Sequence, residues 1–130
     1  MKTSSWIKIS ALSLAFGVAF GALGAHALKD FLSNEQLDWW NKGVFYQLIH
    51  SIGILIIALL LTVKPELNLK WCLRTMLIGI FMFSGSLYIL SINKGLLGDI
   101  TLVKYSMIPI TPIGGSCFIT SWILLFIRVK

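Results

Sequence analysis

Charged residues are scarce in this chain of 130 residues, in which Asp, Glu, Lys and Arg together make up 12%. That fraction is about half of the ~25% that is usual in soluble domains. The charges also stand almost entirely between long uncharged runs, so that no Asp or Glu falls inside a run. The chain therefore lacks the intramembrane carboxylate that ion-coupled pumps commonly use.

Motifs that would support catalysis or cofactor binding are also missing. The sequence contains no haem-attachment Cys-x-x-Cys-His, no glycine-rich phosphate loop after a strand, and no Ser-His-Asp or Cys-His arrangement at a recognised spacing. Only two cysteines occur, Cys72 and Cys117. The two histidines have no carboxylate or cysteine at ligand spacing, so we expect no metal site. We likewise predict no catalytic residues, no cofactor and no enzymatic activity.

Apolar residues make up 57% of the chain and fall into four uncharged runs, at residues 9–28, 43–63, 75–93 and 105–127. A helix needs roughly 20 apolar residues to cross the bilayer core, so each run is long enough to span it. The runs lack the polar stripe of a soluble helix. The sequence therefore predicts an all-α fold, a four-helix transmembrane bundle that forms a single membrane domain over residues 1–130.

The net charge of +6 lies on one side of this topology. The N-terminus, the middle connection and the C-terminus carry seven of the eleven basic residues and one acid, Glu66, whereas the two other connections carry four bases and four acids. Lys and Arg are enriched in cytoplasmic loops, which predicts that both termini are cytoplasmic. We interpret the excess charge as an orientation signal that also attracts anionic lipids, and we expect no nucleic-acid partner.

The first outer connection contains a helix signal, because Ser33 is followed three residues later by Gln36, as in a capping box. We expect a short interfacial helix from Asn34 to Trp40. The N-terminal Lys2 and Lys8, with Ala25-His26-Ala27 after an apolar run, resemble a cleavable signal sequence. That run is long for a signal and has a face of small residues, so we expect it to remain as the first span.

Small residues recur where helices would pack closely. Ser10, Ser13, Gly17, Gly21 and Gly24 share one face of the first span, and Gly85, Gly114 and Gly115 are the counterparts in the third and fourth spans. Close backbone approach over small residues drives helix association in lipid. Packing of Gly17 and Gly21 within the chain is favoured over a dimer face.

The start of the fourth span is open between two alternatives. Thr111 and Pro112 suit the N-cap and first position of a helix, which would leave residues 107–111 non-helical. The other alternative is a kinked helix that begins near Ser106.

Polar side chains from all four predicted spans fall in the outer half of the bilayer. We predict that they form a cluster or a small polar pocket, with the members His26, Tyr46, Gln47, His50, Ser84, Tyr88 and Thr111. Polar groups within a membrane are costly and often functional. Neutral groups of this kind also tie helices together through hydrogen bonds, so both roles stay open.

Four segments together resemble a known family. They are residues 21–29 (GALGAHALK), 46–50 (YQLIH) after Trp40, 83–88 (FSGSLY), and 110–115 (ITPIGG) before Trp122. They are similar to the blocks of the YgdD/YwdK-like inner-membrane proteins, a family defined as a domain of unknown function. Small departures occur at residues 51–53 and at Ser121. The resemblance implies a four-helix integral protein of the bacterial cytoplasmic (inner) membrane, with no established activity.

Three functions fit these observations. The first is a non-enzymatic structural or interaction module whose polar cluster fixes the bundle. The second is an oligomeric carrier or channel for protons or a small polar solute, since histidine titrates near neutral pH. The third is a lipid- or quinone-binding protein. The partners that we expect are membrane lipids and either further copies of the chain or another membrane protein.

Overall fold

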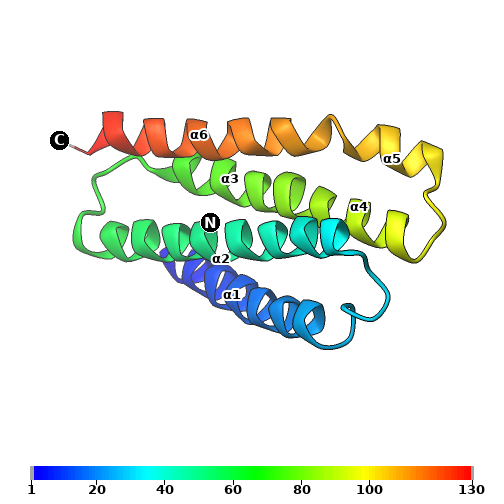
Figure 1. Ribbon diagram of the computed structural model, residues 1–130. Helices are drawn as coiled ribbons and strands as arrows, with labels where there is room; N and C mark the ends of the chain where they lie inside the picture. The colour runs from blue at the N-terminus through cyan, green and yellow to red at the C-terminus, as the bar shows by residue number, and fades with distance from the viewer. Residues whose placement is uncertain (1, 130) are drawn as a thin grey trace.

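Helices form almost all of the computed structural model, which describes residues 2–129, and no strand occurs in that range. The elements are α1 (Thr3–Ala25), α2 (Asn34–Val63), α3 (Lys70–Gly79), η1 (Ile80–Ser84), α4 (Gly85–Gly95), α5 (Thr101–Met107) and α6 (Ile110–Arg128) (Figure 1). The π-helical turn η1 joins α3 and α4 into one helix. Four helices, Thr3–Ala25, Asn34–Val63, Lys70–Gly95 and Thr101–Arg128, are long and apolar enough to cross a membrane. The all-helical, four-span prediction is therefore confirmed.

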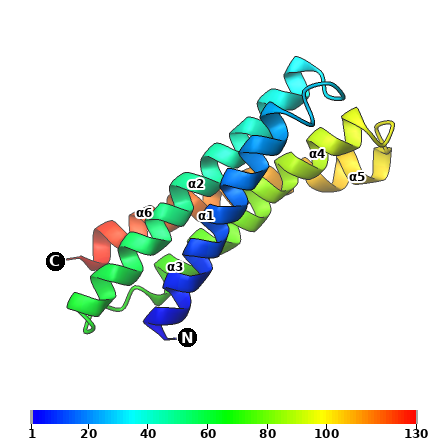
Figure 2. The ribbon, with the colours of Figure 1, turned by 90° about the horizontal axis from the view of Figure 1, so that it is seen from below.

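The four spans lie side by side, with α2 and the continuous helix α3–η1–α4 in the centre. Helix α1 packs on α2, and α6 packs on α3 and η1 (Figure 1). Both termini and the α2–α3 connection lie at one end of the molecule, called the terminal end here (Figure 2). The α1–α2 and α4–α5 connections lie at the opposite end. All four spans thus run antiparallel to their neighbours in sequence.

Helix α2 begins at the predicted capping box. The Ser33 hydroxyl oxygen accepts a hydrogen bond from the Gln36 N–H at 3.4 Å, and the Ser33 N–H donates to Gln36 Oε1 at 2.9 Å. Residues 34–40 are not a separate helix, however, but the first two turns of α2. The helix continues through Gly43 because the Tyr88 ring packs directly on that glycine, 2.7 Å from where a Cβ would lie. This packing offsets the cost of about 0.5–1 kcal/mol of a glycine inside a helix.

The fourth span is helical on both sides of a short interruption, as the kinked alternative predicts, but it starts at Thr101 and not near Ser106. Helix α5 begins at Thr101, α6 begins at Ile110, and the break lies at residues 108–109. Pro109 has no N–H to donate, so one helical hydrogen bond is missing there, although Ile108 and Pro109 both keep helical backbone angles. Pro112 lies in the first turn of α6, where a backbone N–H would have no partner within the helix, so the missing N–H of proline costs nothing there. A helix start with Thr111 as the N-cap is therefore wrong, since Thr111 lies inside α6.

The glycines of α1 and α6 lie at close contacts. A Cβ on Gly17 would lie 2.6 Å from Leu48 Cδ2, and one on Gly114 would collide with the backbone of Phe83 in η1, 2.8 Å from its Cα. Gly21 also faces α2, with Val44 Cγ1 at 3.5 Å. Both glycines of the Gly-x-x-x-Gly pair thus pack within the chain.

Three further predicted packing glycines differ in their surroundings. Gly24 is as crowded as Gly17, with Trp40 Cδ1 at 2.7 Å from a Cβ, and Gly115 makes ordinary contact with the Phe83 ring at 3.6 Å. Gly85 departs from the expectation, because a Cβ there would meet no atom within 4 Å. Gly85 therefore borders open space and joins no close helix contact.

Large apolar side chains cover the outside of the molecule. Phe126, Leu102 and Val63 are 85%, 78% and 78% exposed. A soluble monomer rarely shows apolar surface on this scale. The surface is that of helices that face lipid.

Candidate functional site

Gln47 connects three spans through its side-chain amide. It lies near the middle of α2, and 6% of it is exposed. Its Nε2 donates to the carbonyl oxygen of Ser13 in α1 at 2.8 Å. Its Oε1 accepts from the hydroxyl of Tyr88 in α4 at 2.8 Å. The amide thus links α1 and α4 to α2.

A serine ladder extends this connection toward the terminal end. The hydroxyls of Ser13 and Ser51 lie 2.7 Å apart, and the Ser10 hydroxyl donates to the Ser51 carbonyl at 2.9 Å. Ser51 follows Gln47 by four residues and so shares its helix face. We call Gln47, Tyr88, Ser10, Ser13 and Ser51 the Gln47 network.

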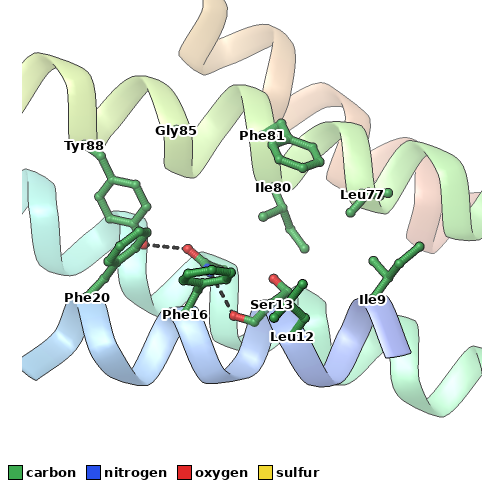
Figure 3. A pocket seen from close by; sticks show the side chains of 11 residues that line it. Ile9, Leu12, Ser13, Phe16, Phe20, Leu77, Ile80, Phe81, Gly85 and Tyr88 are labelled. Atoms are coloured by element: carbon green, nitrogen blue, oxygen red, sulfur yellow. Dashed lines mark hydrogen bonds between the residues drawn. The ribbon is translucent and has the colours of Figure 1, made fainter. Parts of the chain in front are cut away.

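An apolar cleft lies above the Gln47 network, between α1 and the continuous helix α3–η1–α4. Its volume is about 550 Å³. Figure 3 shows Ile9, Leu12 and Phe16 on one wall and Leu77, Ile80 and Phe81 on the other, with open space between them. Gly85 also lines it, and Gln47 lies at its floor with both amide atoms bonded. The cleft therefore presents almost only hydrocarbon to an occupant.

Three aromatic rings close the cleft toward the opposite end. Tyr88 packs against Trp40 with ring centroids 4.7 Å apart and against Phe20 at 5.1 Å. Trp40 Nε1 donates to the Phe20 carbonyl at 2.7 Å. The rings therefore fix α1, α2 and α4 relative to one another on the side of Gln47 nearer the opposite end.

His50 lies on another side of α2, against α6. Its ring stacks on Phe118 at a centroid distance of 3.5 Å and an angle of 11°, and Tyr46 stacks near it at 5.8 Å. Its Nδ1 lies 2.8 Å from the Tyr46 carbonyl oxygen, one turn back in the same helix. A carbonyl only accepts, so Nδ1 is the protonated, donating nitrogen. His50 and Tyr46 thus contribute stacking area between α2 and α6 and make no hydrogen bond to another span.

The remaining members of the predicted cluster are dispersed. Thr111 in α6 bonds to the hydroxyl of Ser86 in α4 at 2.7 Å. Ser84 is buried, and its hydroxyl is the one buried side-chain polar atom without a hydrogen bond within residues 2–129. His26 follows α1 and is exposed. The seven predicted residues therefore form one bonded pair, Gln47 with Tyr88, one stacked pair, His50 with Tyr46, and three separate positions.

Sequence reasoning missed several polar side chains that bond helices together. Ser91 donates to the Gln36 carbonyl at 2.8 Å, and Ser121 donates to the Cys72 carbonyl at 2.7 Å. A signal was available for Ser51, which is four residues from Gln47. The spacing of the polar residues around Ser91 and Ser121 does not predict their bonding partners.

The side chains around the cleft are mainly apolar, and the amide of Gln47 is already hydrogen-bonded. The polar groups of the Gln47 network are used in bonds between helices, and the described lining of the cleft includes no Asp, Glu, Lys, Arg or His. Within residues 2–129 no three His, Cys, Asp or Glu side chains come close enough to hold a metal ion. The site can hold helices in register and accommodate an apolar chain.

Comparison with known proteins gives a family but no activity. A family model described as "Protein of unknown function (DUF423)" matches residues 20–115. A UPF0382 membrane protein of Staphylococcus epidermidis is 37% identical, covering 94% of this chain and 92% of the relative. The UPF0382 membrane protein YwdK of Bacillus subtilis is 34% identical over 94% and 93%, and one of Haemophilus influenzae is 35% identical over 94% and 90%. No solved structure matches.

Proposed function

Because this chain belongs to the DUF423 family of membrane proteins, whose function is unknown, we propose its role from its own geometry. The protein is a non-enzymatic structural or interaction module of the bacterial cytoplasmic membrane. The main observation behind this proposal is that the Gln47 side-chain amide forms hydrogen bonds to both α1 and α4. These bonds hold the two helices against α2. The Gln47 network fixes the spans relative to one another. The apolar cleft stays open to lipid or to a partner protein.

The proposed location and orientation follow from charge and from the relatives. Within residues 2–129 the terminal end carries six of the chain's eleven basic residues and a single acid. Positively charged loops stay in the cytoplasm, which places both termini there. The similar proteins come from bacteria and are described as membrane proteins. The first turns of α2 then lie at the outer interface, where Trp39 and Trp40 suit the headgroup level.

A comparison of two variants tests the structural role against transport. Gln47→Ala and His50→Ala should both lower the thermal unfolding temperature, because the first removes hydrogen bonds to two spans and the second removes the stack on Phe118. Neither should alter pH-driven proton flux in reconstituted vesicles. Flux in the wild type that disappears in His50→Ala at unchanged stability would contradict the proposal and favour a carrier.

The carrier alternative has the weaker geometric support. Ser13 lies beside Ser51, so His50 is level with the middle of α1, whereas His26 follows the end of α1. The 13 residues from Ser13 to His26 correspond to roughly 20 Å along the helix axis at 1.5 Å per residue. The two histidines therefore cannot pass a proton directly to each other.

A second candidate function is the binding of a lipid- or quinone-like molecule, and the cleft favours it. A volume of about 550 Å³ falls within the range of small-molecule pockets. Gly85→Leu should fill the cleft without a clash, because a Cβ there is free of neighbours, and Gly85→Ala is the matched control that adds one methyl group. Native mass spectra of protein extracted from its own membrane should show a bound apolar molecule in the wild type and Gly85→Ala that is lost in Gly85→Leu. Equal spectra for all three would rule out this use of the cleft.

A further inference from the structure

A second groove lies at the terminal end, between the first turns of α3 and the last turns of α6. It has a volume of about 240 Å³, and its walls include Trp71 and Thr75 of α3 with Thr120 and Leu124 of α6. Arg128 stands at its mouth, with Nη1 3.5 Å from the Asn68 carbonyl oxygen. From Arg128 to Thr120 the groove extends over eight residues of α6, or about 12 Å along the helix axis at 1.5 Å per residue. It combines a cationic entrance with an apolar interior.

The cations around this groove are not compensated by acids. All three ion pairs within residues 2–129 lie at the opposite end: Lys42 with Asp38 at 2.7 Å, Lys94 with Glu35 at 2.9 Å, and Lys104 with Asp99 at 3.1 Å. In the described chain no basic residue of the terminal end pairs with an acid. Three of the four bases at the opposite end are thus paired with acids of the protein, whereas the described bases at the terminal end make no ion pair.

A second cation and an aromatic ring lie near the groove. The Arg74 guanidinium lies over the Trp71 ring at 5.2 Å, which holds this second charge close to the groove. Trp71 is exposed at the end of the span, where indole rings prefer the headgroup region. Arginine binds phosphate oxygens through two parallel hydrogen bonds and so recognises more than charge.

We propose that this groove binds one anionic phospholipid of the surrounding leaflet. The phosphate lies on Arg128, with Arg74 adding a second positive charge, and an acyl chain occupies the apolar interior between Trp71 and Leu124. The occupant is a lipid because the cationic mouth and the apolar interior are continuous at headgroup depth. The site is separate from the α1–α4 cleft, so its test does not depend on the function proposed above.

The test is a lipid titration of the detergent-purified full chain, read by native mass spectrometry. The probes are dioleoylphosphatidylglycerol, dioleoylphosphatidylethanolamine and inorganic phosphate. Arg128→Gln removes the charge at the mouth, and Lys64→Gln is the matched control, which removes one charge at the same end outside the groove lining. Arg128→Lys keeps the positive charge but removes the planar guanidinium, which can form two parallel hydrogen bonds to a phosphate. Thermal unfolding of each variant checks that the fold is retained.

The wild type should bind phosphatidylglycerol in preference to phosphatidylethanolamine. Arg128→Gln should weaken that binding about fivefold, as expected for one basic residue near an anionic lipid, and Lys64→Gln should leave it unchanged. The affinity of Arg128→Lys for phosphatidylglycerol should lie between that of Arg128→Gln and that of Lys64→Gln. Equal weakening by Arg128→Gln and Lys64→Gln would overturn the proposal, because it would mean diffuse attraction. Equal binding of the two lipids, or binding of inorganic phosphate as tight as that of phosphatidylglycerol, would overturn it as well.

Discussion

The bond between Gln47 and Tyr88 allows a quantitative test of the Gln47 network. Gln47→Leu removes two bonds between helices, which are worth about 0.6 kcal/mol each in a membrane protein. It also leaves the Tyr88 hydroxyl without its partner, at a cost of about 1 kcal/mol, so that the total loss is about 2.2 kcal/mol. Tyr88→Phe removes one bond and leaves Gln47 Oε1 unpaired, for a loss of about 1.6 kcal/mol.

The double variant distinguishes a real interaction from two independent effects. With both partners removed neither group is left unpaired, so the free energy of unfolding should fall by about 1.2 kcal/mol, well below the ~3.8 kcal/mol sum of the single losses. The assay is unfolding by sodium dodecyl sulfate in mixed micelles, followed by tryptophan fluorescence, since Trp40 packs against Tyr88. Ser116→Ala is the control, because its hydroxyl bonds only within its own helix. Additive losses within about 0.5 kcal/mol would refute the interaction.

Three further predictions use the same unfolding assay. Gly114→Ala should lower the free energy of unfolding by more than 1 kcal/mol, because the added Cβ would meet the η1 backbone. Gly85→Ala should be neutral or slightly stabilising, because a Cβ there meets no neighbour. Equal effects of the two substitutions would contradict the packing described. His50→Phe should keep most of the stability that His50→Ala loses, about 2 kcal/mol, because the ring acts by stacking; a Phe variant as unstable as the Ala variant would show that the polar atoms matter. Ser84→Ala should cost nothing, since that hydroxyl has no partner, and a clear loss would reveal an unrecognised bond.

The spans and their order could be predicted from the sequence because they depend on local properties. Uncharged runs of sufficient length give helices in any apolar solvent, and the Ser33 and Gln36 pair fixes the start of α2 through contacts three residues apart. The distribution of charge between the two ends follows from the order of the spans alone. None of these features needs a partner from a distant part of the chain.

The partners of the polar residues depend on the register between helices, which the sequence does not reveal. Gly114 and Gly85 look alike in their apolar runs, yet one touches the η1 backbone and the other borders the cleft. The π-helical turn itself has no sequence signature, and it lies where Gly114 of α6 meets the Phe83 backbone. Gln47 and His50 are three residues apart, and this spacing alone would place them on one face of α2. The two side chains point to different neighbours, since one stacks on Phe118 and the other bonds to Ser13.

The most direct test of the structural role is a native mass spectrum of the protein gently extracted from its own membranes, with the wild type beside His50→Ala. If the polar residues serve to hold the spans together, both proteins should carry the same bound molecules, with no small molecule or metal that depends on His50. A bound species present in the wild type and absent from a folded His50→Ala would contradict this account and turn the residues around His50 into a binding site.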